Sequence, residues 1–444
     1  MDEMGEMDGE KSAGAAASDL ASALGKITRR LIPFLLLLYV IAYLDRVNVG
    51  FAQLQMKKSL GLSDSVYGLG AGLFFVTYFL FEVPSNLLLE RFGPRRWMAR
   101  IMITWGVLSS ATMLVRGEAS FYALRMGLGL AEAGFFPGII LYLTYWFPPR
   151  ERAAAIARFM RAIAISQIIG GPLSGAILDG LDGVNGWAGW QWLFLIEGLP
   201  SVALGFVVLR LLPDRPAAVR WLSDAEKRAI AGALQAAPAG GAGHDRHTLK
   251  QALADGRVWL LSSIYFCFAM TLYGVTMWLP QIIKDLVGGS ALRVGLLVSI
   301  PYLFAAVVMV LWGRFTDRAG AYRRNLVLTT GIASAALFAT VPLLGVGPAA
   351  ALVALSVGMV AFSASFGPFW TLPASFLRGT AAAAGIAVIN SCGNLGGFAS
   401  PWLVGVIKER TGSFGAGIAA IAGALLVATL LIGVGVRKRD QAVM

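Results

Sequence analysis

The segment LIPFLLLLYVIAYLDRVNVGF, residues 31–51, places two opposite charges, Asp45 and Arg46, behind an almost entirely apolar run. A run of roughly 20 apolar residues is the length that an α-helix needs to cross a bilayer. Each charge near the centre of such a helix costs roughly 2.5–3.5 kcal/mol on insertion scales. Both charges must therefore face protein or water. We interpret the segment as a membrane helix that carries functional groups.

The composition of the whole chain is that of a polytopic membrane protein. Of its 444 residues, 57% are hydrophobic and only 14% are charged, whereas soluble proteins carry roughly 25% charged residues. We therefore expect about twelve spans. They are predicted near residues 31–54, 66–89, 97–115, 119–147, 153–180, 190–212, 256–284, 294–313, 324–345, 348–371, 381–406 and 414–436.

A polar stretch, residues 213–255, divides these spans into two groups of six. It contains PDRPAAVRWLSDAEKRAIAGAL, a predicted surface helix with Ser223 as its cap, followed by APAGGAGHDRH, a flexible linker. The predicted domains are helical bundles at 29–212 and 256–437. They are flanked by an acidic, disordered cytoplasmic tail at 1–28 and a short cytoplasmic tail at 438–444.

The two groups of spans look like copies of each other. NLLLERFGPRRW (86–97) and GRFTDRAGAYRR (313–324) align with Glu90 opposite Asp317, at an offset of 317 − 90 = 227. RERAAAIA (150–157) resembles RGTAAAAGIA (378–387), and IGGPLSG (169–175) resembles LGGFASP (395–401), at nearly the same offset. We predict an all-α membrane protein of two pseudo-symmetric six-helix bundles, with its site between them near the bilayer midplane.

The net charge of +12 describes topology rather than a nucleic-acid partner. If Arg29 and Arg30 lie inside, about 25 Lys and Arg residues face the cytoplasm and about 7 face outward, which is the positive-inside bias. We expect an inner-membrane protein with both termini cytoplasmic, whose partners are the lipid bilayer and a small organic anion, and which is a monomer.

Cysteine and histidine give no sign of a metal site or disulfide. Cys267 and Cys392 lie in apolar segments and are expected to be free thiols. His244 and His247 lie in the polar linker. Proton chemistry inside the membrane must therefore use carboxylates.

Several motifs resemble those of a known family. The loop NLLLERFGPRR resembles the signature loop of the major facilitator superfamily, although Asn86 stands where that loop usually has Gly; RMGLGLAEAG (125–134) resembles its fourth-span motif. The ordered set YLDRVNVGFA (43–52), EVPSNLLLERFG (82–93), AEAGFFPGIILYLTYWFP (131–148) and GWQWLFLIEG (189–198) resembles the anion:cation symporter branch. Characterised members of that branch take up organic acids with protons.

The charges of the first half suit such a function. Arg125 and Glu132 are seven residues apart, so they share a helical face about 10 Å along the axis. With Asp45 and Arg46 they sum to zero, and protonating either acid leaves a net positive cavity that binds an anion more tightly. The resemblance implies that Arg46 receives the substrate carboxylate and that Asp45 and Glu132 carry protons. It also implies that Arg125 takes part in the proton coupling. A structural ion pair is the alternative.

Other residues are candidates for substrate contact. Asn390 and Asn394 share a helical face, and the family pattern suggests that Asn390 reaches the substrate; helix-to-helix bonding is the alternative. Tyr43 and Tyr78 offer hydroxyl donors. Further polar or aromatic candidates are Tyr273, Trp278 and Trp370. Arg161 either contacts a dianionic substrate or extends to the interface.

Charged pairs at the predicted cytoplasmic edge are candidates for a gate. Glu90 and Arg91 follow the second span, and Asp317 and Arg318 follow the eighth. Contacts of these groups between the halves would hold an inner gate shut, and a plain topological anchor is the other interpretation. Small residues, among them Gly171, permit the close helix approach that rocking halves need.

The sequence therefore predicts proton-coupled uptake of a small organic carboxylate by alternating access, with the proton as coupling ion and no other cofactor or metal. Sugar acids, hydroxy-dicarboxylates and aromatic acids all remain open. The alternative is an exporter or antiporter of organic acids or drugs on the same fold. Short loops disfavour a receptor, and the absence of a nucleophile triad or phosphate loop disfavours an enzyme.

Overall fold

A computed structural model describes residues 2–235, 253–376 and 379–436, and in these ranges every regular element is helical. The predicted flexible linker with His244 and His247, and the C-terminal tail, lie outside the described residues. The first half contains α1 (Asp2–Leu60), α2 (Asp64–Phe92), α3 (Pro94–Ala111), α4 (Glu118–Glu132), α5 (Phe135–Thr144), α6 (Pro149–Gly180), α7 (Gly189–Leu211) and α8 (Asp224–Gln235). The second half contains α10 (Gly256–Val287), α11 (Ala291–Ala319), α12 (Tyr322–Leu343), α13 (Pro348–Phe376), α14 (Gly379–Thr411) and α15 (Phe414–Gly435).

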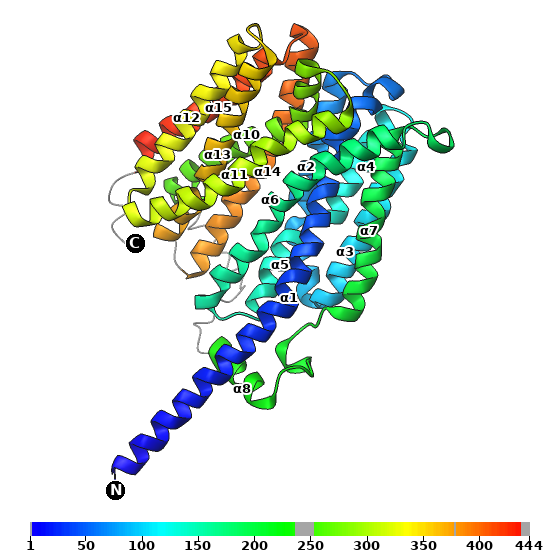
Figure 1. Cartoon of the computed structure of the whole chain (residues 1–444). Helices are drawn as coiled ribbons and strands as arrows, with labels where there is room; N and C mark the ends of the chain where they lie inside the picture. The colour runs from blue at the N-terminus through cyan, green and yellow to red at the C-terminus, as the bar shows by residue number, and fades with distance from the viewer. Residues whose placement is uncertain (1, 236–252, 377–378, 437–444) are drawn as a thin grey trace.

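These helices form the predicted two bundles, in which all twelve expected spans have a counterpart (Figure 1). Ten segments of the described chain are long and apolar enough to cross a membrane. The other two predicted spans are α3 and α14, which are packed among the rest. Three arginines in α3, and two asparagines among the glycines of α14, lower the hydropathy of these helices. Cys267 and Cys392 are free thiols, as predicted.

The fourth span is not one helix. The expected segment 119–147 is divided into α4 and α5 at Gly134, which adopts a left-handed conformation with φ 84°. A Cβ at this position would lie 2.4 Å from the Ser85 hydroxyl oxygen of α2. Glycine allows both the backbone turn and the close approach of α2, so the break directly follows Glu132.

The prediction of a disordered tail over residues 1–28 is wrong, because residues 2–28 continue α1 as helix. Ala23 and Ile27 are buried on this extension. Ser22 donates a 2.7 Å hydrogen bond to Glu226 of α8, and Lys26 forms a 2.7 Å ion pair with the same carboxylate. Tertiary contacts with α8 thus stabilise residues 22–27 of a segment whose small and acidic composition alone suggests disorder.

The extension of α1 and α8 lie at the same end of the molecule, which we call the α8 end; the opposite end is the far end (Figure 1). The predicted surface helix begins as expected at Ser223, whose hydroxyl accepts a bond from the Glu226 amide at 3.2 Å. The Glu226 carboxylate accepts a bond from the Ser223 amide at 2.8 Å in return. This reciprocal arrangement is a capping box.

The packing of the two halves is pseudo-symmetric. In the first half α3 packs on α7, and α2 on α4; in the second half α12 packs on α15, and α11 on α13. The halves meet where α2 packs against α14 and α6 against α11. A Cβ at Gly171 of α6 would lie 2.4 Å from the Gly295 carbonyl oxygen of α11, so this contact depends on glycine.

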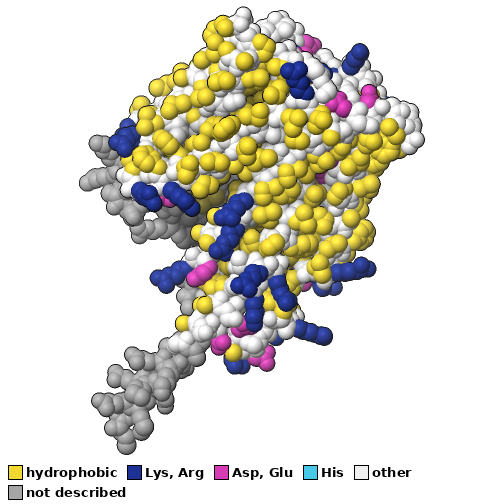
Figure 2. Space-filling view, in the orientation of Figure 1, with side chains coloured by type: hydrophobic (Ala, Val, Ile, Leu, Met, Phe, Trp, Pro, Cys, Tyr) yellow, Lys and Arg dark blue, Asp and Glu magenta, His cyan; other side chains and the backbone are white. Residues whose placement is uncertain are grey.

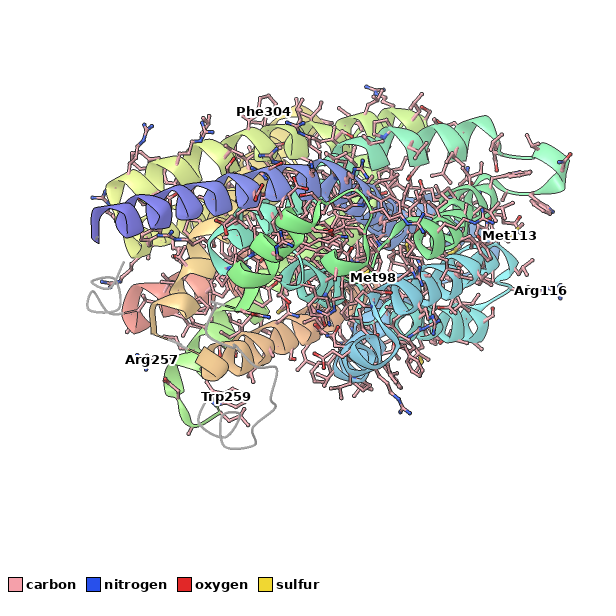
Figure 3. All side chains as sticks on the ribbon, turned by 90° about the horizontal axis from the view of Figure 1, so that it is seen from below. Met98, Met113, Arg116, Arg257, Trp259 and Phe304 are labelled. Carbon is pink, nitrogen blue, oxygen red and sulfur yellow. The ribbon has the colours of Figure 1, made fainter. Side chains whose placement is uncertain are left out.

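The outer surface of both bundles is apolar. Figure 2 shows a broad hydrophobic face, with Lys and Arg gathered below it around the α8 end. Phe304 of α11 points outward at the rim and is 58% exposed, whereas Met98 of α3 is fully buried (Figure 3). An exposed apolar belt between polar ends is the surface of a protein whose helices face lipid.

Candidate functional site

The centre of the first half holds an ion pair between Arg46 of α1 and Glu132 of α4. The two residues are only 8% and 2% exposed. The Arg46 guanidinium also lies over three aromatic rings, at 5.9 Å from the Tyr43 centroid, 5.5 Å from Phe74 and 5.4 Å from Tyr78. Aromatic faces attract a cation most strongly when it is desolvated. The predicted substrate residues Arg46, Tyr43 and Tyr78 therefore lie together.

Arg125 is buried on the same helix as Glu132, as predicted, but binds elsewhere. Its guanidinium donates to the carbonyl oxygens of Gly70 and Ala71 of α2, at 3.4 and 3.2 Å. It lies 5.1 Å from the centroid of the Phe74 ring, whose other neighbour is Arg46. The geometry makes Arg125 a link between α4 and α2 that adds positive charge behind the site.

Asp45 is separate from the Arg46–Glu132 pair. Consecutive residues of a helix point about 100° apart, and Asp45 is directed between α3 and α7. Its carboxylate accepts hydrogen bonds from Ser109 at 2.8 Å, Ser201 at 2.9 Å and Asn48 at 3.4 Å. The expectation of one cavity shared by four charges is therefore wrong in its geometry. The acids occupy two polar clusters.

Asn390 and Asn394 share a face of α14, as predicted, and both bind Glu82 of α2. Each amide donates to one Glu82 oxygen at 3.2 Å, across the boundary between the halves. Sequence reasoning missed Glu82, although an acid in the apolar segment before NLLLERFG was a signal for it. A carboxylate of the protein thus accepts the hydrogen bond of Asn390, the residue of this pair that was assigned to the substrate.

Aromatic side chains of the second half line the same region. Tyr273 of α10 packs on Phe75 of α2, with ring centroids 4.2 Å apart. Trp370 of α13 contacts Tyr265 of α10 edge-on, at 4.9 Å. Trp278, the remaining aromatic candidate, is fully buried and donates to the Pro401 carbonyl at 3.1 Å. Trp370 and Tyr273 remain candidates for substrate contact, whereas Trp278 is part of the packing.

Arg161 is exposed on α6 near the α8 end. It is seven residues from Ile168 and ten from Gly171, so helical periodicity places all three on one face. The backbone carbonyl oxygen of Ile168 accepts a bond from the Ser299 hydroxyl of α11 at 2.7 Å, and Gly171 packs against Gly295. Arg161 therefore lies on the face of α6 that is directed toward the second half, which favours the substrate interpretation over the interfacial one.

The four candidate gate residues are exposed. Asp317 accepts a bond from Tyr322 at 3.2 Å within its own half, and Arg91 lies 5.6 Å from the centroid of Phe92. Among the described residues, no hydrogen bond or ion pair joins Glu90 or Arg91 to Asp317 or Arg318. In this conformation the halves are therefore not held together by these charges.

A second buried acid, Glu197 of α7, was also missed. It is 4% exposed and accepts a bond from Ser174 of α6 at 2.9 Å. The signal for it was again an acid in an apolar segment, GWQWLFLIEG.

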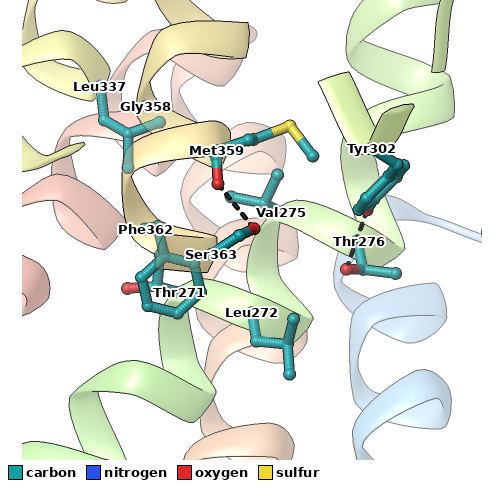
Figure 4. A pocket seen from close by; sticks show the side chains of 10 residues that line it. All are labelled: Thr271, Leu272, Val275, Thr276, Tyr302, Leu337, Gly358, Met359, Phe362 and Ser363. Carbon is teal, nitrogen blue, oxygen red and sulfur yellow. Dashed lines mark hydrogen bonds between the residues drawn. The ribbon is translucent and has the colours of Figure 1, made fainter. Parts of the chain in front are cut away.

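A pocket in the second half, shown in Figure 4, has no charged lining residue and includes Leu272, Val275, Met359 and Phe362. Hydroxyl groups of Thr271, Thr276, Tyr302 and Ser363 also line it, but without a positive charge it is poorly suited to a carboxylate.

Comparison with known proteins agrees with this architecture. The family model described as Major Facilitator Superfamily matches residues 35–401. A protein of Agrobacterium vitis named as a tartrate transporter is 49% identical over 431 residues, which are 97% of this chain and 95% of that one. A protein of Acinetobacter baumannii named as a quinolone resistance transporter is 45% identical over 393 residues, 88% of this chain and 90% of that one. The solved D-xylose-proton symporter has a TM-score of 0.74 at 15% identity, over 94% of this chain and 99% of that one. The chain is an integral membrane protein that belongs to the Major Facilitator Superfamily of transporters.

Proposed function

We propose that the protein imports a small organic carboxylate together with protons across the inner membrane, with the α8 end in the cytoplasm. The observation that carries this proposal is the buried Arg46–Glu132 ion pair within a cage of aromatic rings. A guanidinium is the side chain best suited to bind a carboxylate with two parallel hydrogen bonds.

The ion pair suggests how proton and substrate are coupled. While Glu132 is ionised it neutralises Arg46. Once Glu132 takes a proton, Arg46 is left as a buried cation without a counter-ion, and a substrate carboxylate can replace Glu132. The bound anion in turn raises the proton affinity of Glu132, because linkage between two sites is reciprocal. Substrate and proton therefore cross the membrane together. Return of the empty carrier requires Glu132 to lose its proton and bind Arg46 again.

The relatives narrow the substrate class. The name of the Agrobacterium vitis relative refers to tartrate, a hydroxy-dicarboxylate, and we propose a substrate of this class. Arg46 would bind one carboxylate. Arg161, on the face of α6 toward the second half, would attract the other carboxylate. The hydroxyl groups would bind among Tyr43, Tyr78 and the Asn390 amide, in place of the Asn390 bond to Glu82.

A thermal-shift screen of the purified protein tests the substrate class. Tartrate, a sugar acid, an aromatic acid and a neutral sugar are compared at pH 5.5 and pH 8. A ligand that binds only the folded state raises its stability by mass action. Stabilisation by tartrate that is larger at pH 5.5 is expected, whereas stabilisation by the neutral sugar alone contradicts the proposal.

Efflux is the second candidate function, and the quinolone resistance transporter at 45% identity is the observation that favours it. Proteoliposomes with an imposed pH gradient distinguish the two. Import with protons predicts that tartrate accumulates on the alkaline side. An antiporter accumulates its substrate on the acidic side.

A further inference from the structure

Asp45 belongs to a polar cluster that lies inside the first half and away from Arg46. Its other members are Asn48 on the next turn of α1 and Glu197 on α7. Asp45, Asn48 and Glu197 are 5%, 1% and 4% exposed. Asn48 donates to Asp45 at 3.4 Å, and its side chain also lies close to the Glu197 carboxylate. The amide therefore stands between two carboxylates.

In the part of the chain that the structure describes, no cation balances these two acids. Within the described residues, neither carboxylate has an ion pair with Lys or Arg. The nearest guanidinium of the same helix, Arg46, is paired with Glu132. The charged and polar groups that face the cluster are Glu132 from α4, serines from α3, α6 and α7, and the Trp105 indole from α3. Two ionised carboxylates in a dry interior repel each other strongly, so one of them must hold a proton.

The hydrogen bonds indicate which acid is ionised in this conformation. Asp45 accepts from three donors, and several donated bonds favour the charged form of a carboxylate. Among the described residues Glu197 accepts a hydrogen bond only from Ser174, and its second oxygen, Oε2, is buried without a partner. The proton of the pair therefore belongs on Glu197.

Asn48 supplies the missing acceptor. Its Oδ1 atom is also buried without a partner. The two ends of an asparagine amide are distinguished only by their hydrogen bonds. A protonated Glu197 that donates to Oδ1, while Nδ2 donates to Asp45, satisfies both unpartnered atoms. When the amide turns over, the same side chain accepts from a protonated Asp45 and donates to an ionised Glu197.

We propose that Asp45 and Glu197 share one proton through the Asn48 amide, and that this proton is carried in addition to the one on Glu132. The inference rests on the proposed proton-coupled function. The exchange is balanced: Glu197 gives its O–H proton to Asn48 Oδ1 as Nδ2 gives a proton to Asp45, the imidic acid so formed reverts to the amide as the side chain turns over, and the charge of the pair stays at minus one. Release of this proton to water leaves both acids ionised. This state is costly unless α1 and α7 separate or water enters, so release is tied to a conformational change.

Infrared spectroscopy of the full-length protein in lipid nanodiscs tests the shared proton directly. The carbonyl stretch of a protonated carboxylic acid is separate from that of a carboxylate and shifts in heavy water. Wild type at neutral pH is expected to show this band, and Glu197→Gln is expected to lose it. Glu118→Gln, which removes an exposed acid of α4, is the matched control and keeps it. A wild-type spectrum without a protonated carboxyl overturns the proposal and needs no variant.

Proteoliposomes measure whether this proton is transported. The quantity measured is the number of protons moved per substrate, which follows from the pH gradient at which a given tartrate gradient gives no net flux. Glu197→Gln is expected to move one proton fewer than wild type while it still exchanges tartrate. Asn48→Leu keeps both acids but breaks the bridge, and is expected to slow net uptake more than exchange. Unchanged proton number in Glu197→Gln overturns the inference and leaves the proposed function intact. A different result is also informative. If the wild-type protein transports no organic acid, the proposed function fails. If its infrared band is nevertheless absent from Glu197→Gln, the shared proton stands.

Discussion

Asp179 and Glu409 make equivalent contacts in the two halves of the molecule. Asp179, near the end of α6, accepts hydrogen bonds from the first amides of α11, those of Ala291 at 3.0 Å and Leu292 at 2.7 Å. Glu409, near the end of α14, accepts from Ser65 at the start of α2, at 2.9 Å. Each acid thus caps a helix of the other half, where the unpaired amides and the helix dipole favour a negative charge. All these contacts lie at the far end. They explain why the halves are joined there, while the candidate gate residues at the α8 end remain apart.

Replacing Asp179 by Ala is expected to loosen the far end. Loss of one N-cap costs about 1 kcal/mol, or roughly a fivefold shift between conformations. Hydrogen exchange of the Ala291 and Leu292 amides should accelerate by this factor. The matched control is Asp182→Ala, because Asp182 caps Gly189 within the first half, at 2.8 Å. Equal acceleration at α11 in both variants would contradict a specific link between the halves.

Replacing Arg46 by Ala is expected to abolish uptake and to destabilise the protein. Removal of one partner of a buried pair typically costs 3–5 kcal/mol, because the remaining charge is left unpaired. The double variant Arg46→Ala with Glu132→Gln should recover most of this stability but no uptake. Thermal unfolding and tartrate uptake measured on the same samples separate the two effects. Recovery of uptake in the double variant would show that Arg46 has only a structural role.

The contact between α1 and α8 is expected to weaken in acid. Lys26, with Ser22 and the Ser223 amide, lowers the pKa of Glu226 from 4.5 to about 2. Because the folded pKa lies below the unfolded value, the contact contributes its full stability above pH 4.5 and loses it as the pH falls toward 2. Protease sensitivity of α8 should rise over this range in wild type. Glu226→Gln should be sensitive at every pH, and wild-type cleavage that does not change with pH would refute the coupling.

The sequence predicts the two bundles well because hydropathy, span length and duplication report on burial, which is the property that membrane folding selects most strongly. The break at Gly134 was not predictable in this way. The break depends on the approach of Ser85 from α2. A single glycine within an apolar run does not reveal which residue of another helix packs against it. The helical extension of α1 was missed for a similar reason, since its partner Glu226 is about 200 residues away in the chain.

The sequence predicts which residues belong to the site better than it predicts which contacts they make. Buried charge identifies Asp45, Arg46, Arg125 and Glu132, because each is too costly in lipid to be incidental. Sequence spacing does not show that Asp45 points away from Arg46 toward α7, since that depends on how α1 is rotated within the bundle. Glu82 and Glu197 are each the single charge of an apolar segment and carry no motif of paired charges, although a single acid there has the same insertion cost.

Glu82 provides the sharpest test of how the two halves communicate. Its carboxylate accepts bonds from Asn390 and Asn394 at 3.2 Å, while its charge opposes an anion at Arg46. Glu82→Gln should therefore strengthen tartrate binding by roughly 1 kcal/mol, or about fivefold, because a nearby negative charge is removed. It should also slow transport, since Gln presents only one good acceptor to the two amides. Glu82→Asp keeps the charge and is the matched control. Tartrate affinity by calorimetry and uptake rate should therefore change in opposite directions in Glu82→Gln, and weaker binding in that variant would show that Glu82 helps to bind the substrate.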